Sequence, residues 1–402
     1  MDILILGGGA SGMACALAAA QNPQNRVTVL ERQARVGRKL LSTGNGRCNL
    51  TNLHAAPEDY AGGGAAFCAP ALRAFPPGEI LRFFRELGLL TTAEPDGRVY
   101  PLSDHAGSVV DVLRFALARR ENLRLCTAQC VMALRRKGAG FAVETETDRF
   151  FAHKVVVACG GAAGGKLGGT ADGCRLLESL GHRRAPLRPA LVPLRTDPVL
   201  PRSCKGVKAD VAARLLAGGR ELARETGELL FTETGVSGPV GFALSRSAAH
   251  SPGPALTLEL DFLRDYSLED ILYLLRRRAE DPALEARELF TGCLHSRLGQ
   301  MLCRAAGIPA APMSTVTPAQ LQAAAETAKC LVLPVLGAAG LDQAQVTVGG
   351  ADTREFDPET LESRLCPGVY ACGEVLDVDG PCGGYNLQWA WSSGLLAGRN
   401  FL

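Results

Sequence analysis

Three glycines near the N-terminus have the spacing that allows a chain to hold a diphosphate. Gly7, Gly9 and Gly12 fit G-x-G-x-x-G directly after the apolar run 3–6 and before an Ala-rich stretch with a helical pattern. The first glycine permits a tight turn, the second lets the backbone approach a pyrophosphate, and the third lets the helix pack closely on the strand. We therefore predict a dinucleotide-binding strand, turn and helix, with the helix N-terminus facing the phosphates.

Glu31 adds a carboxylate to this fingerprint. It ends the next predicted strand, residues 27–30, and lies 19 residues after Gly12. A carboxylate at this place accepts both hydroxyls of an adenosine ribose, which disfavours a 2′-phosphate and therefore NADP at this site. Because NAD and FAD both use the fingerprint, the segments that follow must decide between them.

Residues 37–52, GRKLLSTGNGRCNLTN, form a basic segment rich in Gly and Asn with little apolar periodicity. A long polar loop after the ribose acid suits a cofactor that extends past its pyrophosphate. The block resembles G-R-K-x-x-x-[ST]-G-x-G-R-C-N-x-T-N of a bacterial family, the BaiN-like or aminoacetone-oxidase-like FAD-dependent oxidoreductases. Three further motifs of that family resemble residues 98–104 (RVYPLSD), 227–239 (GELLFTETGVSGP) and 373–394 (GEVLDVDGPCGGYNLQWAWSSG). The resemblance covers essentially the whole chain.

The resemblance implies that FAD is the cofactor. The residues implied to bind it lie in the glycine fingerprint, the basic loop, two predicted strands and the closing motif. They are Gly7, Gly8, Gly9, Ala10, Ser11, Gly12, Glu31, Arg32, Arg38, Lys39, Leu40, Ser42, Gly44, Asn45, Arg47, Cys48, Asn49, Val131, Ala158, Cys159, Gly160, Gly373, Glu374, Gly383, Gly384, Tyr385, Asn386 and Leu387.

The chain departs from the family pattern at two places. Many members have a Ser-Tyr-Pro-like stretch after the strand and glycine pair at 155–161, where this chain has AAGGKLGG, and some have His where Glu233 stands. Both differences fall where substrate chemistry can differ. The resemblance therefore predicts the flavin more directly than it predicts the reaction.

The closing motif predicts the second half of the flavin site. Gly373 and Glu374 follow the predicted strand 369–372, and Gly383 and Gly384 form a turn before a helix that begins at about Tyr385. A carboxylate after a strand can hold ribityl hydroxyls, and a helix N-terminus directed at the flavin pyrimidine stabilises the negative charge of the reduced ring. The resemblance implies these roles for Glu374 and for the backbone of residues 383–387.

The order of elements predicts an α/β fold, in which a Rossmann-type FAD-binding domain is split by an inserted β-rich domain that itself carries a small helical subdomain. Strand and helix signals alternate to about residue 181, with a β-rich stretch at 123–151 and a buried strand at 155–159. Ser267 and Asp270 form an N-terminal capping pair in the insert, and residues 317–320, TPAQ, mark a second helix start with Pro at its first position. We predict the FAD-binding domain at 1–186 and 346–402, the β-rich insert domain at 187–264 and 329–345, and the helical subdomain at 265–328.

Composition excludes several classes of protein. Of the 402 residues 47% are hydrophobic, and the net charge of +2 gives no footprint for nucleic acid or an anionic membrane. The 14 cysteines contain no C-x-x-C pair, so we expect reduced thiols, no disulfide framework and no metal site. There is no apolar run of about 18 residues and no basic leader before the first strand. We expect a cytoplasmic protein that binds a small molecule, and neither membrane nor nucleic acid.

The electron partner of the flavin has no fingerprint of its own. Residues 160–165, GGAAGG, have the wrong spacing for a second dinucleotide site, and residues 337–340 lack the second glycine. NAD(P)H would therefore dock transiently, or molecular oxygen would reoxidise the flavin. A redox pair of Cys48 and Cys382, which both fall in flavin-lining motifs, is a third alternative.

Three hypotheses about function remain. The first is an FAD-dependent reductase that moves hydride between flavin N5 and a C=C or conjugated carbonyl compound with NAD(P)H as donor, as the resemblance to bile-acid reductases implies. The second is an FAD-dependent amine oxidase of the aminoacetone type that uses oxygen. The third is an RNA-modifying flavoprotein, against which the near-neutral charge argues.

The flavin itself carries the redox chemistry, and a protein side chain is needed mainly to move a proton over its ring. Tyr385 leads the candidates, followed by Arg47, Tyr100, Glu233 and Cys48, which all lie in motif segments. Asp104 is a further candidate, with helix capping as the alternative role. Geometry must decide among them.

Overall fold

The computed structural model describes all of residues 1–402, and the chain divides into two compact units. Unit 1 consists of Met1–Pro189 and Leu341–Leu402, and unit 2 consists of Ala190–Gly340. Unit 2 is therefore an insert in the sequence of unit 1. The predicted fold class, a Rossmann-type domain split by a β-rich insert, is confirmed.

A five-stranded parallel sheet forms the centre of unit 1, in the order β20-β11-β1-β2-β7. Its strands are short, mainly apolar runs, and β1, β11 and β20 are almost completely buried, which is typical of a parallel sheet covered on both faces. Because the strands are parallel, the loops after β1, β11 and β20 leave from the same edge. The strands are β1 (Asp2–Leu6), β2 (Arg26–Leu30), β7 (Leu123–Cys126), β11 (Lys154–Val157) and β20 (Val369–Ala371).

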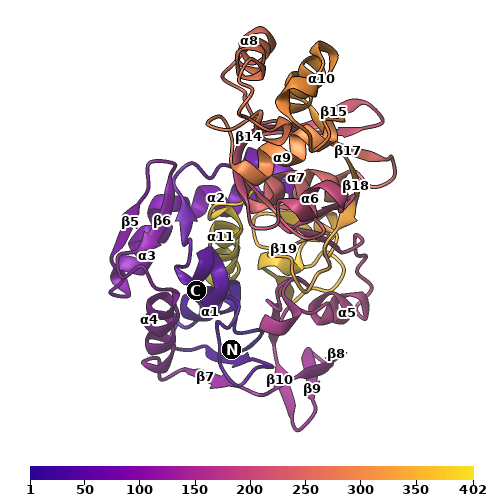
Figure 1. The fold of residues 1–402 in the computed structure, drawn as a ribbon. Coiled ribbons are helices and arrows are strands. Elements are labelled where there is room, and N and C mark those ends of the chain that lie inside the picture. The colour runs from indigo at the N-terminus through magenta and orange to yellow at the C-terminus, as the bar shows by residue number, and fades with distance from the viewer. The chain divides into compact units, whose positions relative to one another are not determined.

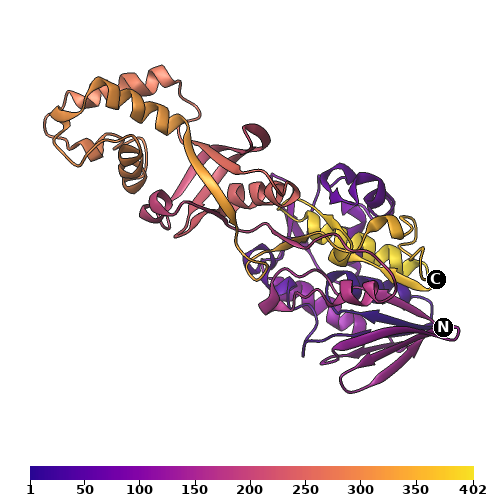
Figure 2. The ribbon, with the colours of Figure 1, turned by 90° about the vertical axis from the view of Figure 1, so that its right-hand side faces the viewer.

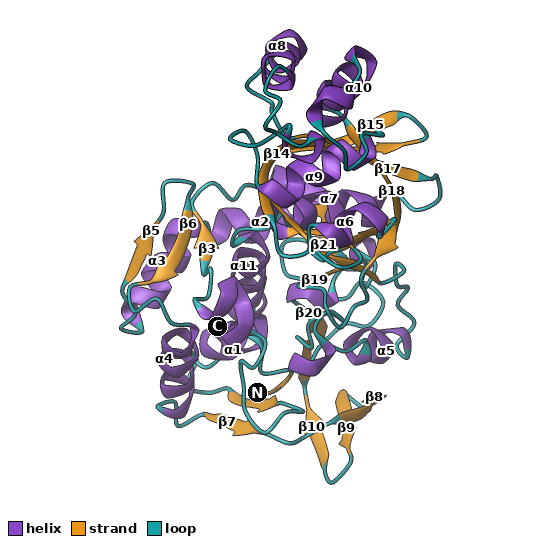
Figure 3. Ribbon diagram, viewed as in Figure 1, coloured by secondary structure: helices purple, strands orange, loops and turns teal.

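Two helices from opposite ends of the chain pack together on this sheet, α1 (Ala10–Ala19) and α11 (Tyr385–Arg399) (Figures 1 and 3). They approach closely because α11 has a glycine at the contact: a Cβ on Gly394 would meet the Cα of Ser11 at 3.0 Å. The other helices of unit 1 are α2 (Gly64–Ala74), α3 (Pro77–Glu86), α4 (Ala106–Ala118) and α5 (Asp172–Glu178).

Small antiparallel sheets complete unit 1. The β-rich stretch predicted at 123–151 is β7 followed by a three-stranded sheet of β8 (Val131–Lys137), β9 (Gly140–Thr145) and β10 (Arg149–Ala152). The strand predicted at 155–159 ends earlier, at Val157, because the chain turns at the glycines that follow. The others are β3 (Thr51–Asn52), β5 (Thr91–Ala93) and β6 (Arg98–Pro101) in one sheet, β4 (Ala61–Gly62) with β21 (Val378–Asp379), and β12 (Arg188–Ala190) with β19 (Val346–Val348).

Unit 2 contains a closed six-stranded barrel in the order β13-β16-β15-β14-β17-β18, with every neighbouring pair antiparallel. Alternate residues of β14, among them Val211, Ala213 and Leu215, are fully buried inside it. The strands are β13 (Leu194–Thr196), β14 (Lys208–Ala217), β15 (Arg220–Phe231), β16 (Gly235–Ser237), β17 (Leu256–Asp261) and β18 (Leu331–Ala338). Two helices accompany them, α6 (Val199–Ser203) and α7 (Gly238–His250).

Three helices of the insert gather at one end of the barrel, shown in orange tones in Figure 2. They are α8 (Leu268–Ala279), α9 (Ser296–Ala305) and α10 (Pro318–Lys329). The predicted capping pair and the predicted helix start are both confirmed. The Ser267 hydroxyl accepts the N–H of Asp270 at 3.1 Å, and at the second start the Thr317 hydroxyl accepts the N–H of Gln320 at 3.3 Å. None of the helices of the chain is long and apolar enough to cross a membrane.

Candidate functional site

The glycine fingerprint forms a tight turn between β1 and α1. Gly7 has a φ of +114° and donates its N–H to the carbonyl of Leu30 at 2.8 Å, and a Cβ on Gly12 would overlap the carbonyl oxygen of Gly7. Gly9 differs from both, because nothing lies within 4 Å of the position a Cβ would take. Gly9 is also the N-cap residue of α1, and no side chain caps this helix end. The turn therefore presents free backbone N–H groups beside open space, as a pyrophosphate requires.

Glu31 is buried at the end of β2 and is held by two backbone groups. Its Oε2 accepts the N–H of Gly8 at 2.7 Å and its Oε1 accepts the N–H of Gln33 at 2.7 Å. Each oxygen keeps a further lone pair for a ribose hydroxyl. The N–H of Gln129 bonds the Glu31 carbonyl at 2.9 Å, which brings the start of β8, with Val131, close to this acid. Three separate segments thus meet around the predicted adenosine end of the site.

Glu374 joins the loops at the same sheet edge. Its carboxylate accepts the Lys39 ammonium at 2.8 Å, the N–H of Thr347 at 2.7 Å and the N–H of Gly161 at 3.4 Å. These partners come from the basic loop, β19 and the turn after β11. Glu374 was predicted to hold ribityl hydroxyls. In this structure the carboxylate connects these three segments, and one of its lone pairs remains for a ligand. Thr347 was missed by sequence reasoning, because it bonds Glu374 through its backbone and no motif marks its position. Its hydroxyl accepts the N–H of Ala163 at 2.9 Å, in the turn after β11.

The basic loop folds back on itself and contains the 3₁₀ segment η1 (Leu40–Gly46). Gly44 and Asn45 both have left-handed backbone, with φ of 55° and 56°. The hydroxyls of Ser42 and Thr43 donate to the carbonyls of Lys39 and Leu40 at 2.9 and 2.7 Å. The loop predicted to be irregular therefore has a defined hydrogen-bonded form.

Two other predicted cofactor residues of this region take part in polar contacts at the surface. Arg32 pairs with Asp172 at 3.3 Å. Arg38 donates to the amide oxygen of Gln33 at 2.7 Å. Gln33 also bonds Glu31, so Arg38 lies near the predicted ribose end of the site.

The end of the basic loop is joined to the closing motif by side-chain contacts. Asn52 donates to the carbonyl of Gly383 at 3.0 Å, and the Thr51 hydroxyl bonds the amide oxygen of Gln388. Gly384 has a φ of +101°, and a Cβ there would lie 2.5 Å from the carbonyl oxygen of Thr51. These contacts position the N-terminus of α11, where Asn386 bonds both backbone groups of Gly380 at 2.8 Å. Thr51 and Gln388 were not predicted as site residues, although each lies inside a family motif.

Arg47 is bound by carboxylates of two other segments. It pairs with Asp104 and, at 3.1 Å, with Glu94, and its guanidinium stacks on the ring of Tyr100 at 3.9 Å from the centroid. The alternative role of Asp104 as a helix cap is wrong, because His105 is the N-cap residue of α4 and no side chain caps this helix. Asp104 instead connects the RVYPLSD motif to the basic loop. Arg47, Tyr100 and Asp104 thus connect the two motifs by direct contacts.

Tyr385 is the first residue of α11, and its carbonyl accepts the hydroxyl of Tyr60 at 2.8 Å. Burial raises the pKa of Tyr385, and the negative charges of Asp59 and Asp96 raise it further. Its phenol therefore stays protonated at neutral pH and can donate a proton.

Glu233 lies in unit 2, on the exposed turn between β15 and β16. It pairs with Lys205 at 2.9 Å, and this hydrogen bond lowers its pKa below the ordinary value for Glu. Glu233 is thus an ionised surface carboxylate within its own unit.

All 14 cysteines are free, and eight of them are buried. Cys48 is fully buried and burial raises its pKa to about 11, while Cys382 is exposed. At pH 8 only about one Cys48 thiol in a thousand would be ionised. Cys159, beside the glycine turn, has its pKa raised to about 12, also by burial. These values favour inert packing thiols.

We expect iodoacetamide at pH 8 to modify the exposed Cys330 and Cys382 and to leave Cys48 intact, because its thiol is both inaccessible and protonated. Peptide mass spectrometry after alkylation of the folded protein measures this. Recovery of a Cys48–Cys382 disulfide from non-reduced protein would restore the redox-pair hypothesis. Denatured protein, in which all thiols react, serves as the control.

The fold and this site define a dinucleotide-binding flavoprotein, in which loops from three parallel strands meet at one sheet edge. The chain matches the model of the HI0933-like protein Rossmann domain over residues 1–400. It belongs to this family, and it is an FAD-dependent oxidoreductase.

Two curated relatives match over nearly their full length. The chain is 39% identical over 400 residues to a 3-dehydro-bile acid delta(4,6)-reductase of Clostridium scindens, covering 98% of this chain and 97% of that protein. It is 32% identical to a ribosomal RNA dihydrouridine synthase of Escherichia coli, covering 98% of this chain and 96% of that protein. The exclusion of nucleic acid on grounds of net charge is therefore not supported.

Among solved structures, a 3-ketosteroid delta1-dehydrogenase from Sterolibacterium denitrificans superposes with a TM-score of 0.52. The match covers 100% of this chain and 99% of that chain, at 14% identity. At this identity the likeness establishes the fold and not the activity.

Proposed function

We propose that this oxidoreductase reduces a C=C bond conjugated to a carbonyl group in a small substrate of the bile-acid or steroid type, with NAD(P)H as the transient electron donor. The observation that carries the proposal is the full-length similarity, at 39% identity, to a reductase named for a 3-dehydro-bile acid. Reducing such a bond adds one hydride and one proton, so the site must orient a hydride source and supply a proton donor.

FAD fits the residues present in unit 1. The open backbone at Gly9 suits the pyrophosphate, the buried carboxylate of Glu31 suits the adenosine ribose, and the free lone pair of Glu374 suits the ribityl chain. When bound, FAD supplies the hydride. The N-terminus of α11, fixed by Asn52 and Thr51, would place its positive end toward the flavin pyrimidine.

We propose Tyr385 as the proton donor. It begins α11 at the turn that we expect to face the flavin, and its raised pKa keeps the phenol protonated through the neutral range. The Tyr60 hydrogen bond to its carbonyl fixes the first turn of the helix. Arg47 is less suited to this role, because two carboxylates and the Tyr100 ring already surround its guanidinium.

Replacing Tyr385 with Phe is expected to lower the rate of substrate reduction about 10²- to 10⁴-fold, the usual contribution of a general acid. The visible flavin spectrum and the rate of flavin reduction by NAD(P)H should stay within a factor of two or three, since the ring is kept and only the hydroxyl is lost. Stopped-flow absorbance measures the two half-reactions separately. Tyr273→Phe, at an exposed position of unit 2, is the matched control. Unchanged substrate reduction in Tyr385→Phe would remove Tyr385 from this role.

The proposal itself is tested by reducing the flavin anaerobically with NADH or NADPH and then adding one candidate oxidant at a time. We expect a 3-oxo-4,6-diene bile acid to reoxidise the flavin and to be recovered with one C=C fewer. If only aminoacetone reduces the oxidised flavin, and oxygen then yields peroxide, the enzyme is an amine oxidase and the proposal fails.

Ribosomal RNA is the second candidate substrate, because two relatives named ribosomal RNA dihydrouridine synthases match at 32% and 27% identity over at least 97% of this chain. Forming dihydrouridine from uridine also reduces a C=C bond conjugated to a carbonyl, so the same residues would serve. The experiment above therefore includes an arm with unmodified ribosomal RNA. Reoxidation by RNA and not by the bile acid would favour this candidate.

A further inference from the structure

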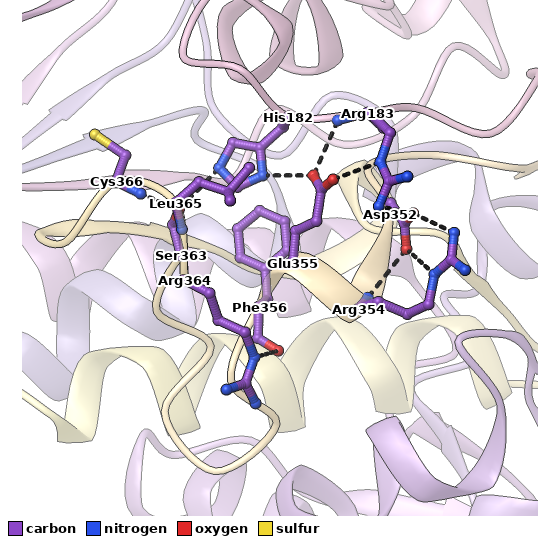
Figure 4. Close-up of polar contacts among 10 residues, drawn as sticks. All are labelled: His182, Arg183, Asp352, Arg354, Glu355, Phe356, Ser363, Arg364, Leu365 and Cys366. Carbon is purple, nitrogen blue, oxygen red and sulfur yellow. Dashed lines mark hydrogen bonds and ion pairs between the residues drawn. The ribbon is translucent and has the colours of Figure 1, made fainter.

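A fully hydrogen-bonded histidine lies in unit 1 outside the flavin site (Figure 4). The His182 side chain has no exposed surface, and its ring stacks on Phe356 with 4.6 Å between centroids and 10° between planes. Its Nδ1 lies 3.0 Å from Oε2 of Glu355, and its Nε2 lies 2.9 Å from the hydroxyl of Ser363. The order serine, histidine, carboxylate is that of a hydrolase triad.

The serine of this group is not arranged as a nucleophile. Ser363 is only 3% exposed, and its oxygen accepts the backbone N–H groups of Leu365 at 3.1 Å and Cys366 at 2.8 Å. With both lone pairs occupied, the hydroxyl hydrogen must point at Nε2 of His182. Nε2 is then the acceptor, and Nδ1–H donates to Glu355. The contacts therefore specify one neutral tautomer of the imidazole.

Protonating this imidazole would break the arrangement. A hydrogen on Nε2 would face the hydroxyl hydrogen of Ser363, whose oxygen has no lone pair left to accept it. Burial accordingly lowers the pKa of His182, although Glu355 opposes this shift. Burial alone would raise the pKa of Glu355, but hydrogen bonds from Arg183 and His182 hold it below the ordinary value.

The other charged groups near the ring are already paired. Arg183 bonds Glu355 at 2.8 Å and lies 3.7 Å from Asp352, which is also bound by Arg354 at 2.6 Å. From α5, Glu178 pairs with Arg184 at 2.8 Å. The surroundings therefore offer the imidazolium no acceptor for Nε2.

Both sides of the group lead by backbone hydrogen bonds to the Gly373–Glu374 turn. On one side the N–H of Ser363 bonds the carbonyl of Val369 at 2.8 Å, at the start of β20, which runs into Gly373. On the other side the N–H of Asp352 bonds the carbonyl of Arg183 at 3.0 Å, and the next residue back, Ala351, bonds the carbonyl of Val375 at 2.8 Å. The group thus braces the turn that carries Glu374 from both directions.

We propose that His182 is a positioning residue for the flavin motif and acts only as the neutral Nδ1–H tautomer, so that mild acid releases the Gly373–Glu374 turn and weakens FAD binding. The inference concerns cofactor retention and does not depend on which substrate is reduced. Because the His182 pKa is lowered, its stabilising contribution is complete above the ordinary histidine value of about 6.5 and is lost as the pH falls below it. Because the pKa of Glu355 is also lowered, protonation of its carboxylate at still lower pH removes a further part of the stability of this group.

Titration of the apoprotein with FAD, followed by flavin fluorescence at pH 7.5, 6.5 and 5.5, tests this inference. We expect the dissociation constant of the native protein to rise severalfold from pH 7.5 to 5.5, with a limit of about tenfold for each unit by which FAD binding lowers the pKa of His182. In His182→Gln the amide can donate to Glu355 and accept from Ser363 without titrating, so the FAD dissociation constant of this variant should change less than twofold between pH 7.5 and 5.5. His54→Gln, a histidine beside the flavin motifs, should keep the native pH response.

Two results would overturn the inference while leaving the proposed reductase activity standing. One is an FAD dissociation constant of the native protein that does not vary with pH, and the other is a His182→Gln protein whose FAD dissociation constant varies with pH as the native one does. If His182→Gln does not fold, the ¹⁵N spectrum of histidine-labelled native protein decides instead. We expect the neutral Nδ1–H form of His182 at pH 7, and a doubly protonated ring at that pH would overturn the inference.

Discussion

Replacing Gly9 with Ala is expected to weaken FAD binding at least about a hundredfold while leaving the apoprotein as stable as the native chain. The backbone at Gly9, φ −80° and ψ −168°, is open to any residue, and nothing of the protein lies within 4 Å of the new Cβ. The new methyl group interferes only when a pyrophosphate approaches the backbone at this position. Displacing the pyrophosphate loses about two charge-assisted hydrogen bonds, which corresponds to about 3 kcal/mol of binding free energy. Flavin fluorescence gives the affinity, and calorimetry of the apoprotein gives the stability.

Two other glycines make the test specific. Gly78→Ala, in the first turn of α3 and equally free of neighbours, should bind FAD normally. Gly12→Ala should instead destabilise the apoprotein itself, by about 1–3 kcal/mol, because its Cβ would overlap the carbonyl of Gly7. Native affinity in Gly9→Ala would show that the pyrophosphate does not lie at this turn.

The second large effect is expected at the Lys39–Glu374 ion pair. Glu374→Gln should weaken FAD binding about 10- to 100-fold, since the neutral amide loses the charge-assisted bond to Lys39 and turns a donor toward groups that are themselves donors. Lys39→Met should have a similar effect, because it leaves the carboxylate partly buried without its cation. Isothermal titration of each apoprotein with FAD measures both constants.

The double variant distinguishes a pair from two separate contacts. If Lys39 acts through Glu374, the two losses should not add, and the coupling should be about 1–2 kcal/mol, above the usual value for an exposed pair because both side chains are about 20–30% exposed. Lys329→Met serves as the control, since the Lys329–Asp261 pair of unit 2 is similarly exposed and 2.6 Å long. Fully additive losses would contradict the bridging role.

Local patterns account for the parts of the fold that the sequence predicted correctly. The fingerprint at Gly7–Gly12, the capping boxes at Ser267 and Thr317, and the helix start at Tyr385 each depend on residues within about four positions of one another. Their geometry follows from backbone sterics and neighbouring hydrogen bonds, so they can be read without knowledge of the rest of the chain. The strand predicted at 155–159 was too long, because the apolar pattern does not show where the chain leaves the sheet. In the structure the strand ends at Val157, before the turn at the sheet edge.

Long-range contacts decided what the sequence could not. The capping role considered for Asp104 was wrong because its carboxylate meets Arg47, 57 residues away, and no local rule reports such a pairing. Thr347 was missed since only its backbone N–H contacts Glu374. The roles of the predicted cofactor residues stay predictions, and the experiments above test those of Gly9, Lys39 and Glu374.

The sequence by itself determined that a dinucleotide is bound by a Rossmann-type domain interrupted by a β-rich insert. The signals for this are the glycine spacing, the apolar strand runs and the acid after the second strand, and each depends only on residues close together in the chain. Only the tertiary structure decided that Glu374 bonds the basic loop, β19 and the turn after β11, that Arg47 is bound by two carboxylates, and that His182 is confined to one tautomer. These properties depend on how many hydrogen bonds each group has already used. Residues far apart in the chain supply those bonds, and only the fold brings them together.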